Sequence, residues 1–264
     1  MKLFCVLVVG LQSSYEKLTH LLAPFALSKL PLVTLTMLSV LIGQIALKNL
    51  GVIFSKTFVD RPLACTSLFG GEAHETIFTH IYNSAPWNAS GFSLSGSQVG
   101  VTREYMDFLQ EFLKENNIKT VVDLGCGDWA FSRFIDWTGI EYIGYDVVKY
   151  VIERNQELFS APNIHFIHAD ILETDLPTGD LLICKDVFQH LPNSEIVAIA
   201  SQFHKFKHCL ITNYICAGNE ENKEIFIGFY RPVDLTKPPF NAPGEKVLHF
   251  FSGVAFKETL HIRN

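Results

Sequence analysis

Between residues 119 and 215 the chain alternates short apolar runs with segments of helical character, and this alternation constrains its fold more than any other feature. Five runs have the length and the nearly continuous apolar character of strands that are covered on both faces: 119–124, 142–147, 164–169, 180–186 and 208–215. Helices are expected between them, near 129–137, 148–159 and 193–206. Strands that alternate with helices predict a parallel sheet with helices on both sides. The predicted fold class is therefore α/β, a Rossmann-like doubly wound and mostly parallel sheet.

The segments on either side of this alternation extend the domain. Apolar side chains recur at helical spacing over 102–116, where Thr102 can act as the N-terminal cap. A short helix is expected near 74–83, in a stretch rich in Gly, Ser and Ala. Near the end of the chain, 246–263 has the pattern of two further strands joined by a turn at Ser252-Gly253.

The 264 residues are enough for one domain with an appendage. Three parts are predicted: a hydrophobic N-terminal helical extension over 1–60, a Ser/Gly-containing lead-in segment over 61–100, and the folded domain over 101–264. The extension is basic, since residues 1–57 hold five lysines and one acid, whereas the whole chain has a formal net charge of -6. A basic, apolar extension attached to an acidic domain suggests that the two parts lie in different environments.

The extension contains an uncharged run, 30–47, which Lys29 and Lys48 bound. Eighteen residues are close to the lower limit for crossing a hydrocarbon core of roughly 30 Å, and flanking lysines can reach the head groups. A membrane anchor is therefore predicted for 30–47. The alternatives are a buried or amphipathic extension, and a translation start at Met37 that removes the span. Lysines on both sides leave the orientation open.

Aspartates stand at the ends of four successive predicted strands: Asp123, Asp146, Asp170 and Asp186. The carboxyl ends of parallel strands share one edge of the sheet, where ligands bind near the point at which the strand order reverses. We therefore expect these carboxylates to surround a single ligand site.

The turn after the first strand, 123–128, suits S-adenosylmethionine (SAM). Its glycines, Gly125 and Gly127, allow a sharp turn and a close approach of the backbone to a ligand. Asp146 is placed to accept hydrogen bonds from both ribose hydroxyls, and Asp170 can accept one from the adenine amino group. An acidic rim also favours the positive sulfonium. The candidate cofactor-binding residues are Asp123, Gly125, Cys126, Gly127, Asp128, Asp146, Asp170, Ile171 and Trp87.

A dinucleotide site is the main rival, because Gly125-x-Gly127-x-x-Ala130 followed by Asp146 also satisfies the dinucleotide fingerprint. Three acids favour SAM. Asp123 precedes the first glycine where dehydrogenases usually have an apolar residue or glycine, Asp128 would crowd a pyrophosphate, and Asp170 adds a further negative charge. A nucleotide-free α/β domain is the remaining alternative.

These residues resemble class I SAM-dependent methyltransferases, and from about Ile77 to Ile262 the chain is similar to a poorly characterised bacterial branch of methyltransferase-domain proteins. The branch shares an aromatic and Ser/Gly-rich lead-in, a Cys-Gly-Asp turn, an acidic-then-His segment and an Arg-Pro…Pro-Pro-Phe tail. The matches are Ile81-Tyr82-Asn83, Trp87, Ser93–Ser97, Cys126-Gly127-Asp128, Lys185–Leu191, Arg231–Leu235 and Pro238-Pro239-Phe240. Gln98 departs from the pattern, where a second glycine is usual. The resemblance implies methyl transfer from SAM and names no acceptor.

The acceptor side should lie just past the fourth strand. Methyl transfer from a sulfonium is an in-line displacement, in which the protein mainly aligns the acceptor and excludes water. Oxygen or nitrogen acceptors can need a base, and Asp186 and His190 are the candidates, with a turn cap and a packed histidine as their alternatives. Arg231 either holds an anionic acceptor or forms a surface ion pair. The segment 216–230 is either a lid or a plain loop.

Charge and cysteine content exclude some partners. A net charge of -6 argues against nucleic acid. No Cys/His spacing indicates zinc, so no metal is expected, and six cysteines without a Cys-x-x-Cys pair indicate reduced thiols of a cytosolic domain.

The predicted function is transfer of a methyl group from SAM to a small-molecule or glycan-like acceptor. The catalytic domain is expected to face the cytoplasm, which holds SAM, with 30–47 as its candidate membrane anchor. The alternatives are a non-catalytic, membrane-tethered scaffold with a SAM fold and, with less support, a nicotinamide-dependent oxidoreductase. The sequence leaves the acceptor atom and the oligomeric state open.

Overall fold

The computed structural model describes residues 72–83, 102–218, 220–253 and 255–264. All of them belong to one compact unit, Thr66–Asn264. The predicted extension 1–60 with its candidate span, and most of the lead-in segment with Trp87, lie outside the described residues. Among the residues that the structure describes, no helix is both long enough and apolar enough to cross a membrane.

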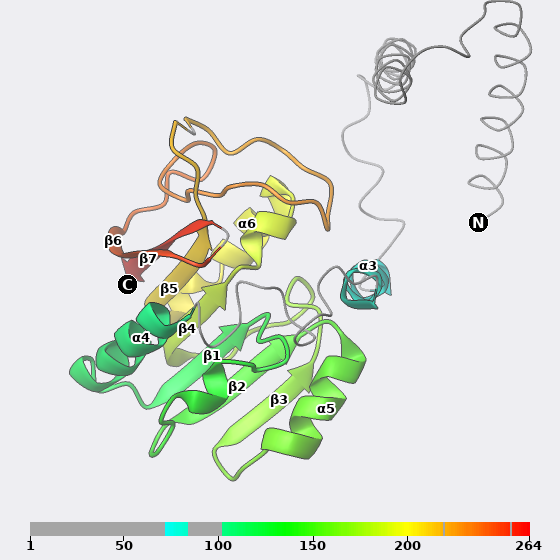
Figure 1. Cartoon of the computed structure of the whole chain (residues 1–264), viewed down its shortest axis with the longest axis vertical. Helices are drawn as coiled ribbons and strands as arrows, with labels where there is room; N and C mark the ends of the chain where they lie inside the picture. Colours follow the sequence, from blue (N-terminus) through cyan, green and yellow to red (C-terminus); the bar gives the residue numbers. More distant parts are fainter. Residues whose placement is uncertain (1–71, 84–101, 219, 254) are drawn as a thin grey trace, which may run out of the picture. The chain divides into compact units, whose positions relative to one another are not determined.

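A seven-stranded sheet forms the centre of the domain (Figure 1). In chain order its strands are β1 Thr120–Leu124, β2 Glu141–Asp146, β3 Ile164–His168, β4 Gly179–Lys185, β5 Phe206–Tyr214, β6 Glu245–Phe251 and β7 Phe256–Arg263. Their spatial order is β3-β2-β1-β4-β5-β7-β6. Strands β1 to β5 pair in parallel, and β7 pairs antiparallel with both β5 and β6. The predicted doubly wound, mostly parallel sheet and the predicted terminal hairpin are confirmed.

The chain leaves β1 towards β2 and β3 on one side and returns to β4 and β5 on the other. The strand order therefore reverses between β1 and β4, which is where open α/β sheets bind their ligands. The five parallel strands point their carboxyl ends to the same edge, and Asp123, Asp146 and Asp186 stand at or next to those ends. The expectation that these aspartates share one edge is confirmed.

Four helices accompany the sheet in the described residues: α3 Glu72–Asn83, α4 Arg103–Glu115, α5 Lys149–Phe159 and α6 Asn193–Ala200. Thr102 precedes α4 as predicted, but its hydroxyl donates to the Met106 sulfur at 3.7 Å and makes no capping bond to the backbone.

Two predicted helices differ from the structure. The segment 129–137 holds only a 3-10 turn, Ser132–Phe134. Its buried residues are Trp129, Phe131, Ile135 and Trp137, which follow each other at spacings of two and four rather than three and four, whereas Phe134 is exposed. The predicted helix 193–206 is also wrong in its second half. It ends at Ala200, and a 3-10 turn, Phe203–Lys205, leads into β5, which begins two residues earlier than expected.

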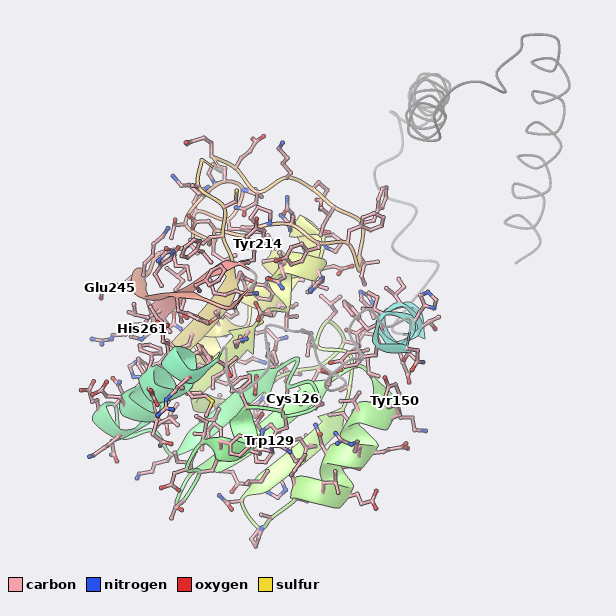
Figure 2. All side chains as sticks on the ribbon, viewed as in Figure 1. Cys126, Trp129, Tyr150, Tyr214, Glu245 and His261 are labelled. Atoms are coloured by element: carbon pink, nitrogen blue, oxygen red, sulfur yellow. The ribbon has the colours of Figure 1, made fainter. Side chains whose placement is uncertain are left out.

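The two faces of the sheet carry separate hydrophobic cores. Helices α4 and α5 cover one face, where Trp129 packs against Tyr142, Phe159 and Phe166 with ring centroids 5.3 to 5.6 Å apart (Figure 2). Helix α6 and the segment 231–242 cover the other face. Covering both faces explains why the central strands β1 and β4 are buried along most of their length.

Candidate active site

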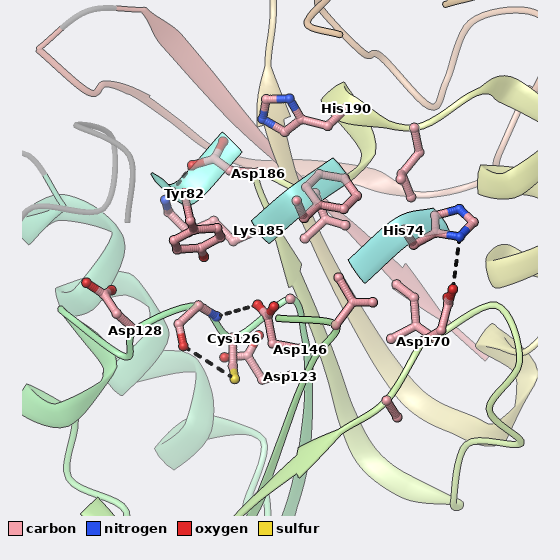
Figure 3. A pocket seen from close by; sticks show the side chains of 18 of the residues that line it. His74, Tyr82, Asp123, Cys126, Asp128, Asp146, Asp170, Lys185, Asp186 and His190 are labelled. Atoms are coloured by element: carbon pink, nitrogen blue, oxygen red, sulfur yellow. Dashed lines mark hydrogen bonds and ion pairs between the residues drawn. The ribbon is translucent and has the colours of Figure 1, made fainter. Parts of the chain in front are cut away.

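A pocket opens at the carboxyl ends of β1 to β4, at the point where the strand order reverses (Figure 3). The pocket brings together ten residues that the sequence singles out: Asp123, Gly125, Cys126, Gly127, Asp128, Asp146, Asp170, Ile171, Asp186 and His190. Trp87 lies outside the described residues. Sequence reasoning missed the contributions of Lys185 and of three residues of α3: His74, Phe78 and Tyr82.

The turn after β1 is fixed to the neighbouring strand. The backbone N–H groups of Gly125 and Cys126 both donate to the Tyr145 carbonyl, at 2.8 and 3.0 Å. Gly125 and Gly127 have φ angles of 70° and 57°, a region that favours glycine. The turn is thereby held open towards the pocket with its backbone accessible to a ligand.

Replacing Gly125 with alanine tests this geometry. A Cβ atom there would lie 2.4 Å from Cγ2 of Val187, and the φ of 70° is unfavourable for alanine. We expect a loss of unfolding free energy of about 2–5 kcal/mol, from about 1–2 for the φ and about 1–3 for overpacking. Gly139→Ala is the matched control, because Gly139 has a φ of 74° but no atom within 4 Å of its Cβ position. Urea unfolding measures both, and equal losses would contradict the steric argument.

Asp146 organises the glycine turn from the end of β2. Its Oδ2 accepts from the Gly127 N–H at 3.0 Å, and its Oδ1 accepts from the Val148 N–H at 2.9 Å. On the other side of the turn, the Asn155 side chain donates to the Gly127 carbonyl at 2.7 Å. Burial raises the pKa of Asp146, against the effect of its backbone donors. Asn155 was missed, although a polar residue beside Val151 and Ile152 on the buried face of α5 is a signal.

Asp123 lies at the floor of the pocket and titrates near neutrality. Its Oδ2 accepts from the Tyr142 hydroxyl at 2.7 Å, and its side chain is almost fully buried. Burial raises the pKa of Asp123 to about 6, although Tyr142 and the charge of Lys185 act in the opposite direction. The carboxylate is therefore mostly ionised above that pH and mostly neutral below it.

Asp170 is paired with a histidine from α3. Nδ1 of His74 lies 3.0 Å from Oδ2 of Asp170, and Nε2 lies 3.3 Å from Oε1 of Glu195 at the start of α6. The contacts with Asp170 and then with Glu195 raise the pKa of His74 to about 10, so the imidazole is cationic at neutral pH. Burial opposes ionisation of Asp170, but His74 and the Leu172 N–H lower its pKa.

Asp186 sits between two lysines. It has a φ of 64° and pairs with Nζ of Lys185 at 2.6 Å and Nζ of Lys257 at 2.5 Å. Burial alone would raise the pKa of Asp186, but the two ammonium groups hold it below its ordinary value. Lys257 comes from β7, far along the chain, and no local pattern indicates that it meets Asp186.

His190 lines the pocket, and each of its ring nitrogens has a hydrogen-bond partner. Its Nδ1 lies 3.0 Å from the Phe229 carbonyl, which can only accept, so Nδ1 carries the proton and donates. Nε2 is then the basic nitrogen, and it accepts from the side-chain N–H of Gln189 at 3.4 Å. Burial lowers the pKa of His190, so the ring is neutral at neutral pH. This tautomer is the one that a general base requires.

Arg231 and the segment 216–230 support His190. The Arg231 guanidinium is buried and donates to the carbonyls of Lys223 and Leu191, at 2.7 and 2.8 Å. Of the two alternatives for Arg231, the surface ion pair is wrong because the side chain is buried, and the role towards an anionic acceptor stays untested, since Arg231 is not among the residues that line the pocket. The Gly228 N–H donates to the His190 carbonyl at 2.8 Å, and the Asn193 N–H donates to the Glu224 carboxylate at 2.8 Å, so the segment is attached to the chain on either side of Leu191.

Comparison with known proteins agrees with this arrangement. Residues 121–207 match the methyltransferase domain family. Two solved structures share the fold. Magnesium protoporphyrin IX methyltransferase from Synechocystis PCC 6803 with bound SAH is 14% identical, with a TM-score of 0.52, over 70% of this chain and 96% of that chain. N-methyltransferase NodS from Bradyrhizobium japonicum WM9, in complex with S-adenosyl-l-homocysteine (SAH), is 15% identical, with a TM-score of 0.53, over 72% and 97%. A search of curated proteins gives no match. Residues 121–207 therefore form a methyltransferase domain, and the strand order and the site around it support a class I SAM-dependent methyltransferase.

Proposed function

We propose that this chain transfers a methyl group from SAM to a small-molecule acceptor with an oxygen or nitrogen nucleophile. The observation that carries the proposal is the pocket itself, where the glycine turn and four strand-end aspartates meet at the switch point of the sheet. When bound, SAM supplies an activated methyl group on a positive sulfonium. The two solved neighbours are named for a porphyrin acceptor and for N-methylation, and a small-molecule acceptor is consistent with both.

The residues of the pocket fit SAM. Asp146 is placed to accept the ribose hydroxyls, and the turn at Gly125 and Gly127 has no Cβ atoms that would keep a ligand away. Asp170 and Ile171, which line the pocket just past the end of β3, would contact the adenine. The carboxylate of Asp123 adds negative charge below the position that the sulfonium would take.

On the acceptor side we assign the base to His190. Its Nε2 is the proton acceptor of the neutral ring, whereas Asp186 is held ionised by two lysines and is a weak base. The negative charge of Asp186 instead offsets part of the positive charge of the two lysines at the end of β4. A glycan-like acceptor remains part of the proposal, since a hydroxyl nucleophile needs the same base.

Calorimetry with SAM and with SAH tests the function and its charge argument together. We expect both ligands to bind the full chain. From pH 5 to pH 7.5, as Asp123 ionises, the affinity for cationic SAM should rise about threefold to tenfold more than the affinity for SAH, which corresponds to roughly 0.7–1.4 kcal/mol.

Asp123→Asn removes the titrating group and should flatten the SAM-to-SAH ratio between these pH values. Absence of binding of either ligand at millimolar concentration would overturn the proposed function and favour the non-catalytic scaffold. Binding with an unchanged ratio would overturn only the role of Asp123. The membrane anchor at 30–47 stays a proposal, which partition of the full chain between membrane and aqueous fractions would test.

A further inference from the structure

Helix α3 precedes the segment that matches the methyltransferase domain family, and nothing in that match assigns it a role. The helix nevertheless contributes three side chains to the pocket: His74, Phe78 and Tyr82. Figure 3 shows His74 above Asp170, at the end of the pocket opposite to Asp128. The lead-in helix is thus part of the ligand site.

His74 makes two ion pairs from one ring. Each nitrogen faces a carboxylate, Asp170 at 3.0 Å and Glu195 at 3.3 Å. All three side chains are largely buried, with 10 to 15% of each exposed. An imidazole that lies between two largely buried carboxylates is favoured as the cation, because each carboxylate faces one of its nitrogens.

The position of Asp170 is set from two directions. The Leu172 N–H donates to Oδ1 at 2.9 Å, and His74 contacts Oδ2. A carboxylate has about four acceptor sites, so these two contacts orient the group and leave capacity for a further donor from the ligand. Glu195 contacts the imidazole from α6. Ile77, which belongs to α3 like His74, lies next to Gly228.

We infer that His74 is a positioning residue, which orients the Asp170 carboxylate so that it can accept a hydrogen bond from the 6-amino group of the adenine. The inference rests on the proposed function. Loss of His74 would free the Asp170 carboxylate to rotate and to protonate more readily, and recognition of the amino group would weaken, whereas contacts to the ribose and the amino acid part would persist.

A ligand pair isolates this role: SAH and S-inosylhomocysteine, in which an oxo group replaces the 6-amino group. For the full-length wild type we expect SAH to bind at least tenfold more tightly, because the oxo group cannot donate to Asp170. In His74→Leu the SAH affinity should fall about fivefold to tenfold and the S-inosylhomocysteine affinity by less than twofold. Calorimetry of both ligands gives the ratio, which a merely structural role would not change.

Two further variants complete the test. His80→Leu is the matched control, since His80 is an exposed histidine of the same helix, and it should keep the wild-type ratio. If His74→Leu does not fold, Glu195→Gln leaves the imidazole in place and should still reduce the ratio by twofold or more. An equal loss for both ligands, or an unchanged ratio in both variants, would overturn the inference. Failure of the wild type to bind SAH would instead overturn the proposed function.

Discussion

Replacing Asp146 with alanine is expected to weaken SAM binding by at least tenfold, and the contacts of this carboxylate favour a loss nearer to a hundredfold. Two ribose hydrogen bonds to a charged acceptor are lost, each worth about 1.5–3 kcal/mol. In addition, the N–H groups of Gly127 and Val148 lose their acceptor, so the turn that meets the ligand loses its anchor. A hundredfold change corresponds to about 2.7 kcal/mol, well within these contributions. Calorimetry with SAM measures the change.

Two variants separate ribose recognition from general damage. Asp146→Asn keeps one acceptor oxygen and should lose less affinity than the alanine variant. Glu153→Ala removes an exposed carboxylate of α5 that pairs only at the surface with Lys149, and it should bind SAM as the wild type does. Circular dichroism must show that the Asp146 variants keep the fold. An Asp146→Ala protein with a wild-type spectrum and unchanged affinity would contradict the ribose role.

The strands and the acidic edge were predictable because both depend on local patterns. Apolar runs of five to nine residues identify the strands, and the shared direction of parallel strands then places Asp123 and Asp146 together without any knowledge of packing. The helix predicted at 129–137 failed for the same kind of reason. Its aromatic residues make the segment apolar enough for a buried helix, but their spacing does not fit one. The prediction relied on composition and did not take the spacing into account.

The partners of the acids could not be predicted, because they come from distant elements. His74 belongs to a helix in the lead-in segment, and Lys257 follows Asp186 by 71 residues. No local pattern indicates that such residues meet at one sheet edge. Asn155 is intermediate, since its place on the apolar face of α5 marks it as buried but not as a donor to Gly127.

These partners divide the pocket electrostatically. Asp123 and Asp146 accept hydrogen bonds from neutral donors, whereas Asp170 pairs with His74 and Asp186 pairs with two lysines. Negative charge is therefore concentrated over the ends of β1 and β2, next to the glycine turn. A sulfonium is favoured at that position, and the end of β4 carries no excess negative charge that would hold the cation on the acceptor side.

His190→Asn is expected to lower the rate of methyl transfer by about a hundredfold to ten-thousandfold while SAM affinity changes by less than twofold. The asparagine nitrogen can replace Nδ1 as the donor to the Phe229 carbonyl, so the loop keeps its attachment and only the basic nitrogen is lost. The measurement is the rate at which labelled methyl groups pass from SAM into a cell-extract fraction. The fraction used is the one that the wild-type protein methylates. His204→Gln, an exposed histidine after α6, is the matched control and should keep the full rate.

The pH dependence gives this prediction its sign. Burial lowers the pKa of His190 below its ordinary value, so the neutral base is the main form at neutral pH. The wild-type rate should rise with pH through that lowered pKa and then stay level, because protonation removes the base only on the acidic side. The asparagine variant should lack this rise. A variant that keeps both the rate and the acidic limb would assign the proton transfer elsewhere, and Asp186 would not be the substitute, since its lowered pKa leaves it ionised across the whole range.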